Sequence, residues 1–168
     1  MKNYVTIFVI FVLYSCTGKD KQVTSIMLPD NMELLSGSYR SKFDGIDSEI
    51  RMIVYFDSTA CSNCTIKNFW IWTGLINSFE QYNDQASIVF IFAPGKSERL
   101  HTKSMLKDYV VNYPVYIDSA YTFRKINPKI NNQFFGIIDH DNNVLLSGYP
   151  FDSPNKQNQY IRILKNHK

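Results

Sequence analysis

The sequence predicts an α/β fold built on a central mixed β-sheet flanked by helices. Short apolar runs rich in β-branched and aromatic residues, typical of buried strands, alternate with segments whose apolar residues recur every three or four positions, typical of helices. Near the end of the chain, two strand-like runs follow each other across a polar turn, as in a hairpin. From the central strand onward the predicted order is strand, helix, strand, helix, strand, helix, strand, strand, helix, which indicates a mixed sheet.

The composition is that of a single domain with an ordinary apolar core. The chain has 168 residues, of which 45% are hydrophobic and 15% aromatic, and its net charge is +3. A fold of this size buries roughly 68–70% of its unfolded surface, so its core needs no cross-link. The small net charge, and a sequence without a basic stripe interleaved with aromatics, argue against nucleic acid as a partner.

The N-terminus has the features of an export signal. A short positive start precedes an almost wholly apolar run from Tyr4 to Tyr14, which is too short for a membrane-spanning helix. The run ends in Leu13-Tyr14-Ser15-Cys16, which resembles the lipobox of a bacterial lipoprotein signal. The resemblance implies that residues 1–15 are removed and that Cys16 is lipidated. An ordinary signal peptide with a chance cysteine is the alternative.

Lipidation of Cys16 implies a protein of the cell envelope, attached to a membrane through its lipid. Residues 16–22 would then be a tether, and residues 23–168 the folded domain. Thr17 is not the aspartate that commonly retains lipoproteins at the inner membrane, so we expect the outer membrane, facing the periplasm. Such a compartment permits disulfides. If Cys16 carries the lipid, the two remaining cysteines, Cys61 and Cys64, form a pair.

Three strands are predicted in the first third of the chain. Val23–Leu28 is the first, ended by the turn residues Pro29-Asp30-Asn31, and Leu34–Tyr39 is a candidate edge strand. Met52–Phe56 is the central strand, because its continuous apolar run is bounded by Asp57-Ser58-Thr59.

An amphipathic helix is predicted after the central strand. Gly74 lies inside it and would mark a bend, because glycine costs about 1 kcal/mol relative to alanine in a helix. Trp70 and Trp72 are interpreted as core residues. The spacing of three and four that predicts the helix is carried by Ile66, Phe69, Trp70, Trp72, Ile76 and Phe79.

A second buried strand is predicted over Ser87–Ala93, followed by a helix that Ser97 caps and that runs to Val110. A solvated helix face is the simple interpretation of this helix, and a docking site for an acidic partner is the alternative. The basic side chains that raise the question are Lys96, Arg99, His101, Lys103 and Lys107.

The remaining elements are short. Tyr113–Asp118 is a predicted strand, and Ser119–Ile126 a helix ended by Asn127-Pro128. Gln133–Asp139 and Val144–Tyr149 are the two strands of the hairpin.

A last helix is expected after Ser153-Pro154, a serine N-cap followed by proline at the first helical position.

Cys61-Ser62-Asn63-Cys64 lies between the central strand and the amphipathic helix. Two cysteines three apart at a helix start lie on one face, with Cβ atoms roughly 5–6 Å apart. The free N–H groups and the dipole of a helix start lower the pKa of such a cysteine from about 8.5 towards roughly 3.5–7.5. Because the thiolate attacks disulfides, Cys61 is the candidate nucleophile, and Cys64, one turn in and more buried, the candidate resolving thiol. A structural disulfide or half a metal site is the alternative.

Three stretches resemble the thioredoxin superfamily, and within it the membrane-anchored TlpA/ResA-like and peroxiredoxin-related proteins. The central strand with Cys61–Cys64 and the following helix is similar to the active-site unit. Tyr113–Asp118 is similar to a "Y/F-P-V-x-x-D" stretch, and Phe135–Val144 to the hairpin "T-F-L-I-D-x-D-G-x-V". The resemblance covers about Glu49 to Lys168. It implies a thioredoxin-like fold and thiol–disulfide exchange through a Cys61–Cys64 disulfide, without a cofactor.

The chain departs from the family at three positions near the cysteines. Gln133 stands where the family places a cis-proline before the hairpin strand, Ala60 replaces a tryptophan, and Ser62-Asn63 replaces a proline within the motif. We expect a trans peptide before Gln133, because non-proline cis bonds cost about 2.5–4 kcal/mol. Its amide would then lie near Cys61, able to donate to the thiolate or cover it. Gln133 and Phe134 are candidate residues for substrate binding or for support of the cysteines.

Two further sites were suggested by residue type. Asp57, four residues before Cys61, would shuttle a proton for the resolving thiol or, alternatively, cap the loop. His101 and His140, together with the cysteines, suggest the copper site of Sco-like proteins, but those use Cys-x-x-x-Cys, so we expect no metal.

Two functions therefore follow from the sequence. The first is an envelope thiol–disulfide oxidoreductase that acts on protein thiols or disulfides. The second is a redox-inactive thioredoxin-fold lipoprotein, a binding or accessory module with a structural Cys61–Cys64 disulfide. In either case we expect a monomer.

Overall fold

A computed structural model describes residues 23–36, 48–60, 62–82, 86–108 and 114–167. The predicted signal peptide, Cys16 and the tether lie outside these residues. None of the described helices is long and apolar enough to cross a membrane.

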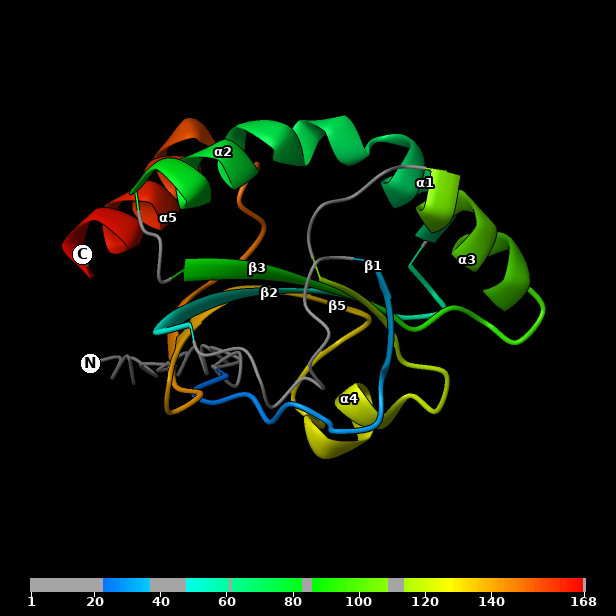
Figure 1. The fold of residues 1–168 in the computed structure, drawn as a ribbon. Coiled ribbons are helices and arrows are strands. Elements are labelled where there is room, and N and C mark those ends of the chain that lie inside the picture. Colours follow the sequence, from blue (N-terminus) through cyan, green and yellow to red (C-terminus); the bar gives the residue numbers. More distant parts are fainter. Residues whose placement is uncertain (1–22, 37–47, 61, 83–85, 109–113, 168) are drawn as a thin grey trace, which may run out of the picture.

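The described strands form one mixed sheet in the order β1-β4-β3-β2-β5-β6 (Figure 1). At its centre, β2 (Ile50–Phe56) pairs parallel with β3 (Ala86–Phe92) and antiparallel with β5 (Gln133–Asp139). β4 (Val115–Ile117) extends the parallel part beyond β3, and β6 (Val144–Ser147) closes the hairpin with β5. The predicted α/β fold with a central mixed sheet is confirmed.

The sheet is covered on both faces (Figure 1). Helices α1 (Ser62–Lys67), α2 (Thr73–Tyr82), α3 (Arg99–Asp108) and α5 (Pro154–Asn166) lie over one face, and α4 (Thr122–Ile126) lies under the other. Full coverage explains why β2 and β3 are continuous apolar runs rather than alternating ones.

Two hydrophobic clusters result, one on each side of the sheet. Alternate β2 residues divide between them: Val54 and Phe56 pack under α1, α2 and α5, whereas Ile53 and Tyr55 pack against α4. Phe90 lies at the centre of the first cluster, fully buried, with its ring 4.7 Å from that of Phe69 and 5.5 Å from that of Trp72.

The predicted long helix is divided into α1, a 3₁₀ segment η2 (Phe69–Trp72) and α2. The division is centred on Asn68, whose amide nitrogen and side-chain Nδ2 both donate to the Cys64 carbonyl, at 3.2 and 3.0 Å. Three residues per turn place Phe69 and Trp72 on the same buried side, while Trp70 is 72% exposed. The predictions that Gly74 marks the bend and that Trp70 is a core residue are therefore wrong.

The predicted strand Val23–Leu28 is also wrong. Ser25 makes a single β-bridge to Asn143, and the rest of the segment crosses beneath the sheet as irregular chain. Its backbone is held instead by the Asn127 side chain, which accepts from the amide of Met27 and donates to its carbonyl, both at 2.8 Å. Ile26 is fully buried in the cluster on the α4 side.

The other elements follow the predictions with shifted ends. β1 (Glu33–Ser36) is the edge strand, paired antiparallel with β4; Ser38 and Tyr39 lie outside the described residues. α3 begins at Arg99, two residues after Ser97. α5 has the expected cap, since the Ser153 hydroxyl accepts from the Lys156 amide at 3.2 Å.

Candidate functional site

The site lies where β2 passes into α1, on the helix-covered face of the sheet. After Phe56 the chain turns through Asp57–Ala60, with the Ala60 amide donating to the Asp57 carbonyl at 3.1 Å. Cys61 lies outside the described residues. Ser62 begins α1 and is buried, with 1% of its surface exposed.

Asp57 anchors this turn. It is 1% exposed, and its Oδ1 accepts from the amide of Thr59 at 2.8 Å and from its hydroxyl at 2.7 Å. Its Oδ2 forms an ion pair with Arg124 of α4, and its backbone amide donates to the Asn132 carbonyl at 2.9 Å. One carboxylate oxygen thus closes the turn on Thr59 and the other joins it to α4, while the backbone amide ties the turn to the residue before β5; these are the contacts of a loop cap.

Cys64 is disulfide-bonded and exposed. The sequence predicted that Cys64 is more buried than Cys61; Cys61 lies outside the described residues, so this comparison stays a prediction. Ser62, Ile66 and Phe69 form the buried side of the segment, at spacings of four and three, so Cys64 lies between them on the outer side.

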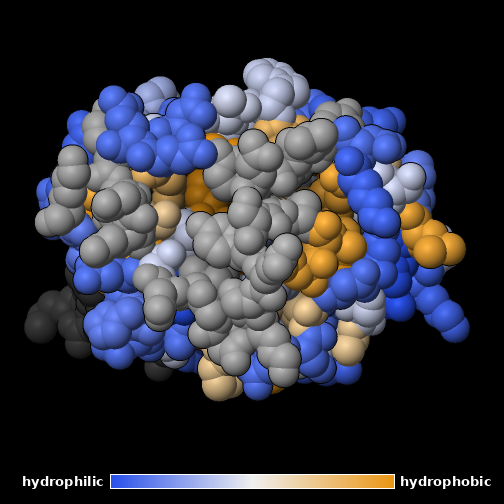
Figure 2. Space-filling view, in the orientation of Figure 1, coloured by the Kyte–Doolittle hydropathy of each residue, from blue (hydrophilic) through white to orange (hydrophobic). Residues whose placement is uncertain are grey.

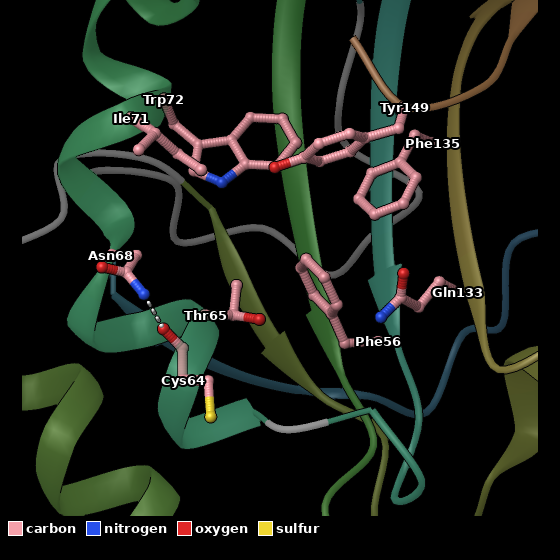
Figure 3. Close-up of a pocket in the computed structure, with 9 residues that line it drawn as sticks. All are labelled: Phe56, Cys64, Thr65, Asn68, Ile71, Trp72, Gln133, Phe135 and Tyr149. Carbon is pink, nitrogen blue, oxygen red and sulfur yellow. Dashed lines mark hydrogen bonds between the residues drawn. The ribbon is translucent and has the colours of Figure 1, made fainter. Parts of the chain in front are cut away.

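A pocket of about 410 Å³ opens beside Cys64 (Figure 3). α1 and η2 form one wall, the ends of β2 and β5 form the opposite wall, and Tyr149 reaches in from the chain after β6. The lining residues are Phe56, Cys64, Thr65, Asn68, Ile71, Trp72, Gln133, Phe135 and Tyr149.

Gln133 shares this pocket with Cys64; its predicted position near Cys61 concerns a residue outside the described part of the chain and stays a prediction. Gln133 is exposed at the start of β5, opposite Phe56 in the strand register. None of the described residues follows a cis peptide bond, and the bond before Gln133 is therefore trans, as expected from the absence of proline.

Phe134 does not line the pocket. It packs on the opposite face of the sheet, in the cluster that contains Tyr55, its partner in the strand register. Phe135 lines the pocket instead, because side chains along a strand alternate between faces and Gln133 therefore shares a face with Phe135. The same alternation, applied to the sequence, would have identified Phe135.

The inner wall of the pocket is aromatic. The Phe135 ring lies 5.4 Å from Phe56, 5.0 Å from Tyr149 and 6.0 Å from Trp72, measured between centroids. Burial raises the pKa of Tyr149 above its ordinary value, which already keeps the hydroxyl neutral at physiological pH. The indole N–H of Trp72 is buried and has no acceptor among the described residues.

The histidines suggested for copper do not form a site in the described part of the chain. His101 and His140 are both exposed, and His140 lies 3.2 Å from the Asp141 carboxylate. No group of three metal-ligating side chains is found among the described residues.

No protein-family model matches this sequence, and no curated protein matches it. Solved structures do match the fold. A protein named as thiol:disulfide interchange protein DsbE from Chlorobium tepidum superposes with a TM-score of 0.58 at 13% identity, over 85% of this chain and 98% of that one. The exposed lipoprotein thioredoxin of Streptococcus pneumoniae superposes with a TM-score of 0.51 at 15% identity, over 79% of this chain and 99% of that one.

The bacterioferritin comigratory protein of Xanthomonas campestris, whose structure is described in relation to alkyl peroxide reduction, gives a TM-score of 0.57 at 12% identity. It aligns over 88% of this chain and 100% of that one. At these identities the comparisons concern the fold. Together with the sheet order and the helices on both faces, they show that this chain has a thioredoxin-like fold.

Proposed function

We propose that the protein is a thiol–disulfide oxidoreductase that uses Cys61 as nucleophile and Cys64 as resolving thiol. The observation that carries the proposal is Cys64 itself: it is disulfide-bonded, exposed in the first turn of the helix after the central strand, and beside a pocket. An exposed disulfide next to a cavity is open to attack by a thiolate, as a redox-active disulfide requires.

The exchange proceeds in two balanced steps. The Cys61 thiolate attacks one sulfur of a substrate disulfide, forming a mixed disulfide and releasing the other substrate sulfur as a thiolate. The Cys64 thiolate then attacks Cys61, forms the Cys61–Cys64 disulfide and releases the second substrate sulfur. The substrate gains two electrons and two protons, and the protein dithiol loses them. In reverse, the same steps oxidise a substrate dithiol.

We place this activity in the cell envelope, with protein thiols or disulfides as partners. The support is the lipobox-like Leu13–Cys16 and the fold likeness to a lipoprotein thioredoxin. Attachment through lipidated Cys16 to the outer membrane, facing the periplasm, is part of the same proposal, as is a monomeric state.

An inert disulfide in a binding module is the second candidate. Gln133 and Ala60, which stand where the family has proline and tryptophan, favour it.

The deciding experiment is a trap of the mixed disulfide. In Cys64→Ser, attack by Cys61 has no resolving thiol, so covalent complexes with partners should accumulate and disappear on reduction. Cys61→Ser/Cys64→Ser is the control. If Cys64→Ser yields no more complexes than the double variant, the protein is the inert module.

A further inference from the structure

The pocket beside Cys64 is uncharged throughout. None of its nine lining residues is an acid, a lysine, an arginine or a histidine, and the phenol of Tyr149 is neutral at physiological pH because the ordinary pKa of tyrosine is about 10. A charged group entering this space would lose water without gaining an opposite charge, which is unfavourable. The pocket therefore selects a neutral occupant.

Its walls suit a planar ring. Phe56, Trp72, Phe135 and Tyr149 surround the inner part, and three of their contacts are edge-to-face. Aromatic rings prefer such offset and edge-to-face neighbours at centroid distances of about 4.5–7 Å. The volume of about 410 Å³ lies near the lower end of ligand pockets, so a single ring has ample room to enter it.

One polar group in the wall lacks a partner. The Trp72 side chain is 1% exposed, and its indole N–H has no acceptor among the described residues. Figure 3 shows this nitrogen on the edge of the indole that faces Thr65, towards the interior of the pocket. Buried donors are nearly always paired, so an occupant with an acceptor at this depth would complete the site.

The Cys64 sulfur lies at the opposite end of the pocket from Trp72 (Figure 3). We propose that the pocket receives a tyrosine side chain that flanks the reacting cysteine of the substrate protein, an inference that rests on the proposed function. The ring lies among the aromatic walls, and the phenol oxygen accepts from the Trp72 indole N–H. The protein thus selects disulfides with a neighbouring tyrosine.

The test uses single turnovers of the reduced full chain with short peptides. Each peptide carries one cysteine linked to glutathione and, on either side of it, a variable residue: Tyr, Phe, Ala, Lys or Asp. The protein dithiol becomes a disulfide as the peptide thiol and glutathione are released, so no further reductant is needed. The rate at which the protein reduces each peptide is divided by the rate at which dithiothreitol reduces the same peptide. This ratio removes differences in intrinsic reactivity between the peptides.

We expect the Tyr peptide to react roughly tenfold or more faster than the Ala peptide when the variable residue stands before the cysteine, after it, or in both places, because the ring is buried. It should react about three- to tenfold faster than the Phe peptide, the effect of one net hydrogen bond. The Lys and Asp peptides should be no faster than Ala. Equal rates for all five would overturn the inference and leave the proposed function intact, whereas no reaction with any peptide would contradict the proposed function itself.

Trp72→Phe tests the hydrogen bond directly, because it keeps a ring and removes the N–H. The preference for Tyr over Phe should vanish in this variant while the preference for Phe over Ala remains. Trp70→Phe is the matched control, with the same change at an exposed residue of the same 3₁₀ segment that does not line the pocket. A Tyr preference that survives Trp72→Phe would contradict the assignment.

A second readout does not depend on altering Trp72. The chain has two tryptophans, so Trp70→Phe leaves Trp72 as the sole indole. In Trp70→Phe/Cys64→Ser, trapped as a mixed disulfide with each peptide, the ¹⁵N-labelled indole resonance should move downfield with Tyr and not with Phe. Identical resonances in the two complexes would also reject the proposal.

Discussion

Asp57 is a buried carboxylate beside the site with partners on both of its oxygens. Its carboxylate is almost wholly buried, yet it has Thr59 on one oxygen and Arg124 on the other. A buried charge is tolerated only when it is paired in this way. The pair joins the turn before Cys61 to α4 on the far side of the sheet, so it fixes where the cysteine motif begins.

Arg124→Met should therefore destabilise the protein. Removing one partner of a fully buried pair costs about 3–5 kcal/mol, but Arg124 is half exposed, so we expect the free energy of unfolding to fall by roughly 1–3 kcal/mol. Denaturant unfolding measures the change. Lys125→Met, at an exposed neighbour in α4, is the control; equal effects of the two substitutions would show that the ion pair contributes nothing.

The reactivity of the two cysteines should differ in mildly acidic solution. Since Cys64 is exposed, burial does not shield it from an alkylating reagent. At about pH 6 the reduced protein should be alkylated faster at Cys61, whose pKa we expect to be lowered by its place before a helix. The rates should converge near about pH 9, above the unperturbed pKa of about 8.5. Equal rates at both pH values would favour the inert module.

Gln133 should restrict general disulfide reduction. It opens on the same pocket as Cys64, with a trans peptide before it, so it offers a substrate a side-chain amide where the family offers proline. We expect weak insulin reduction by the unmodified protein and an increase in Gln133→Pro, which the first residue of a strand tolerates. Gln133→Ala removes the side-chain amide without adding a proline ring, so it separates these two effects of Gln133→Pro on insulin reduction. Robust insulin reduction by the unmodified protein would contradict this prediction.

At the scale of elements, the turn after β6 connects the sheet, α5 and the pocket. Gly148 has φ of +116°, its amide donates to the Phe135 carbonyl at 2.9 Å, and its carbonyl accepts from the Tyr160 hydroxyl at 2.6 Å. The left-handed conformation turns the chain so that the next residue, Tyr149, enters the pocket.

Gly148→Ala and Gly74→Ala should change stability in opposite directions. At Gly148 the positive φ strains any side chain, and we expect a loss of about 1–3 kcal/mol in the free energy of unfolding. At Gly74, inside α2, an added Cβ meets no atom within 4 Å, and alanine should gain up to about 1 kcal/mol. Thermal unfolding measures both, and a shift of the same sign in the two variants would refute the argument.

At the scale of the whole molecule, the described residues present few large apolar side chains to solvent. Among the residues coloured by hydropathy in Figure 2, hydrophilic ones predominate and the hydrophobic areas are separate from one another. Among the described residues, the large exposed apolar side chains are Met27, Trp70, Leu100, Leu145 and Tyr149. We therefore expect membrane attachment to depend on the N-terminal cysteine rather than on the folded domain.

Cys16→Ser should abolish lipid labelling and move the protein to the soluble fraction after export. One acyl chain binds a membrane only marginally, so stable attachment requires the several chains of a bacterial lipoprotein. Fractionation with metabolic labelling by a fatty acid is the measurement. Wild-type protein that is soluble, unlabelled and begins at another residue would contradict the predicted anchor.

The sequence by itself determined the fold class, the central strands of the sheet and the last helix. β2, β3 and β5 are apolar runs with turn residues at their ends, and α5 has its serine cap and proline, so local patterns were sufficient. The placement of the cysteine motif between a strand and a helix was evident for the same reason.

The tertiary structure decided which side chains meet. The predicted helix is divided at Asn68, whose side chain binds the Cys64 carbonyl, and the 3₁₀ segment that follows buries Trp72 and exposes Trp70. The pocket draws its lining from two strands, two helical segments and the chain after β6. Periodicity reports one element at a time, whereas a cavity depends on which faces of several elements are brought together by packing.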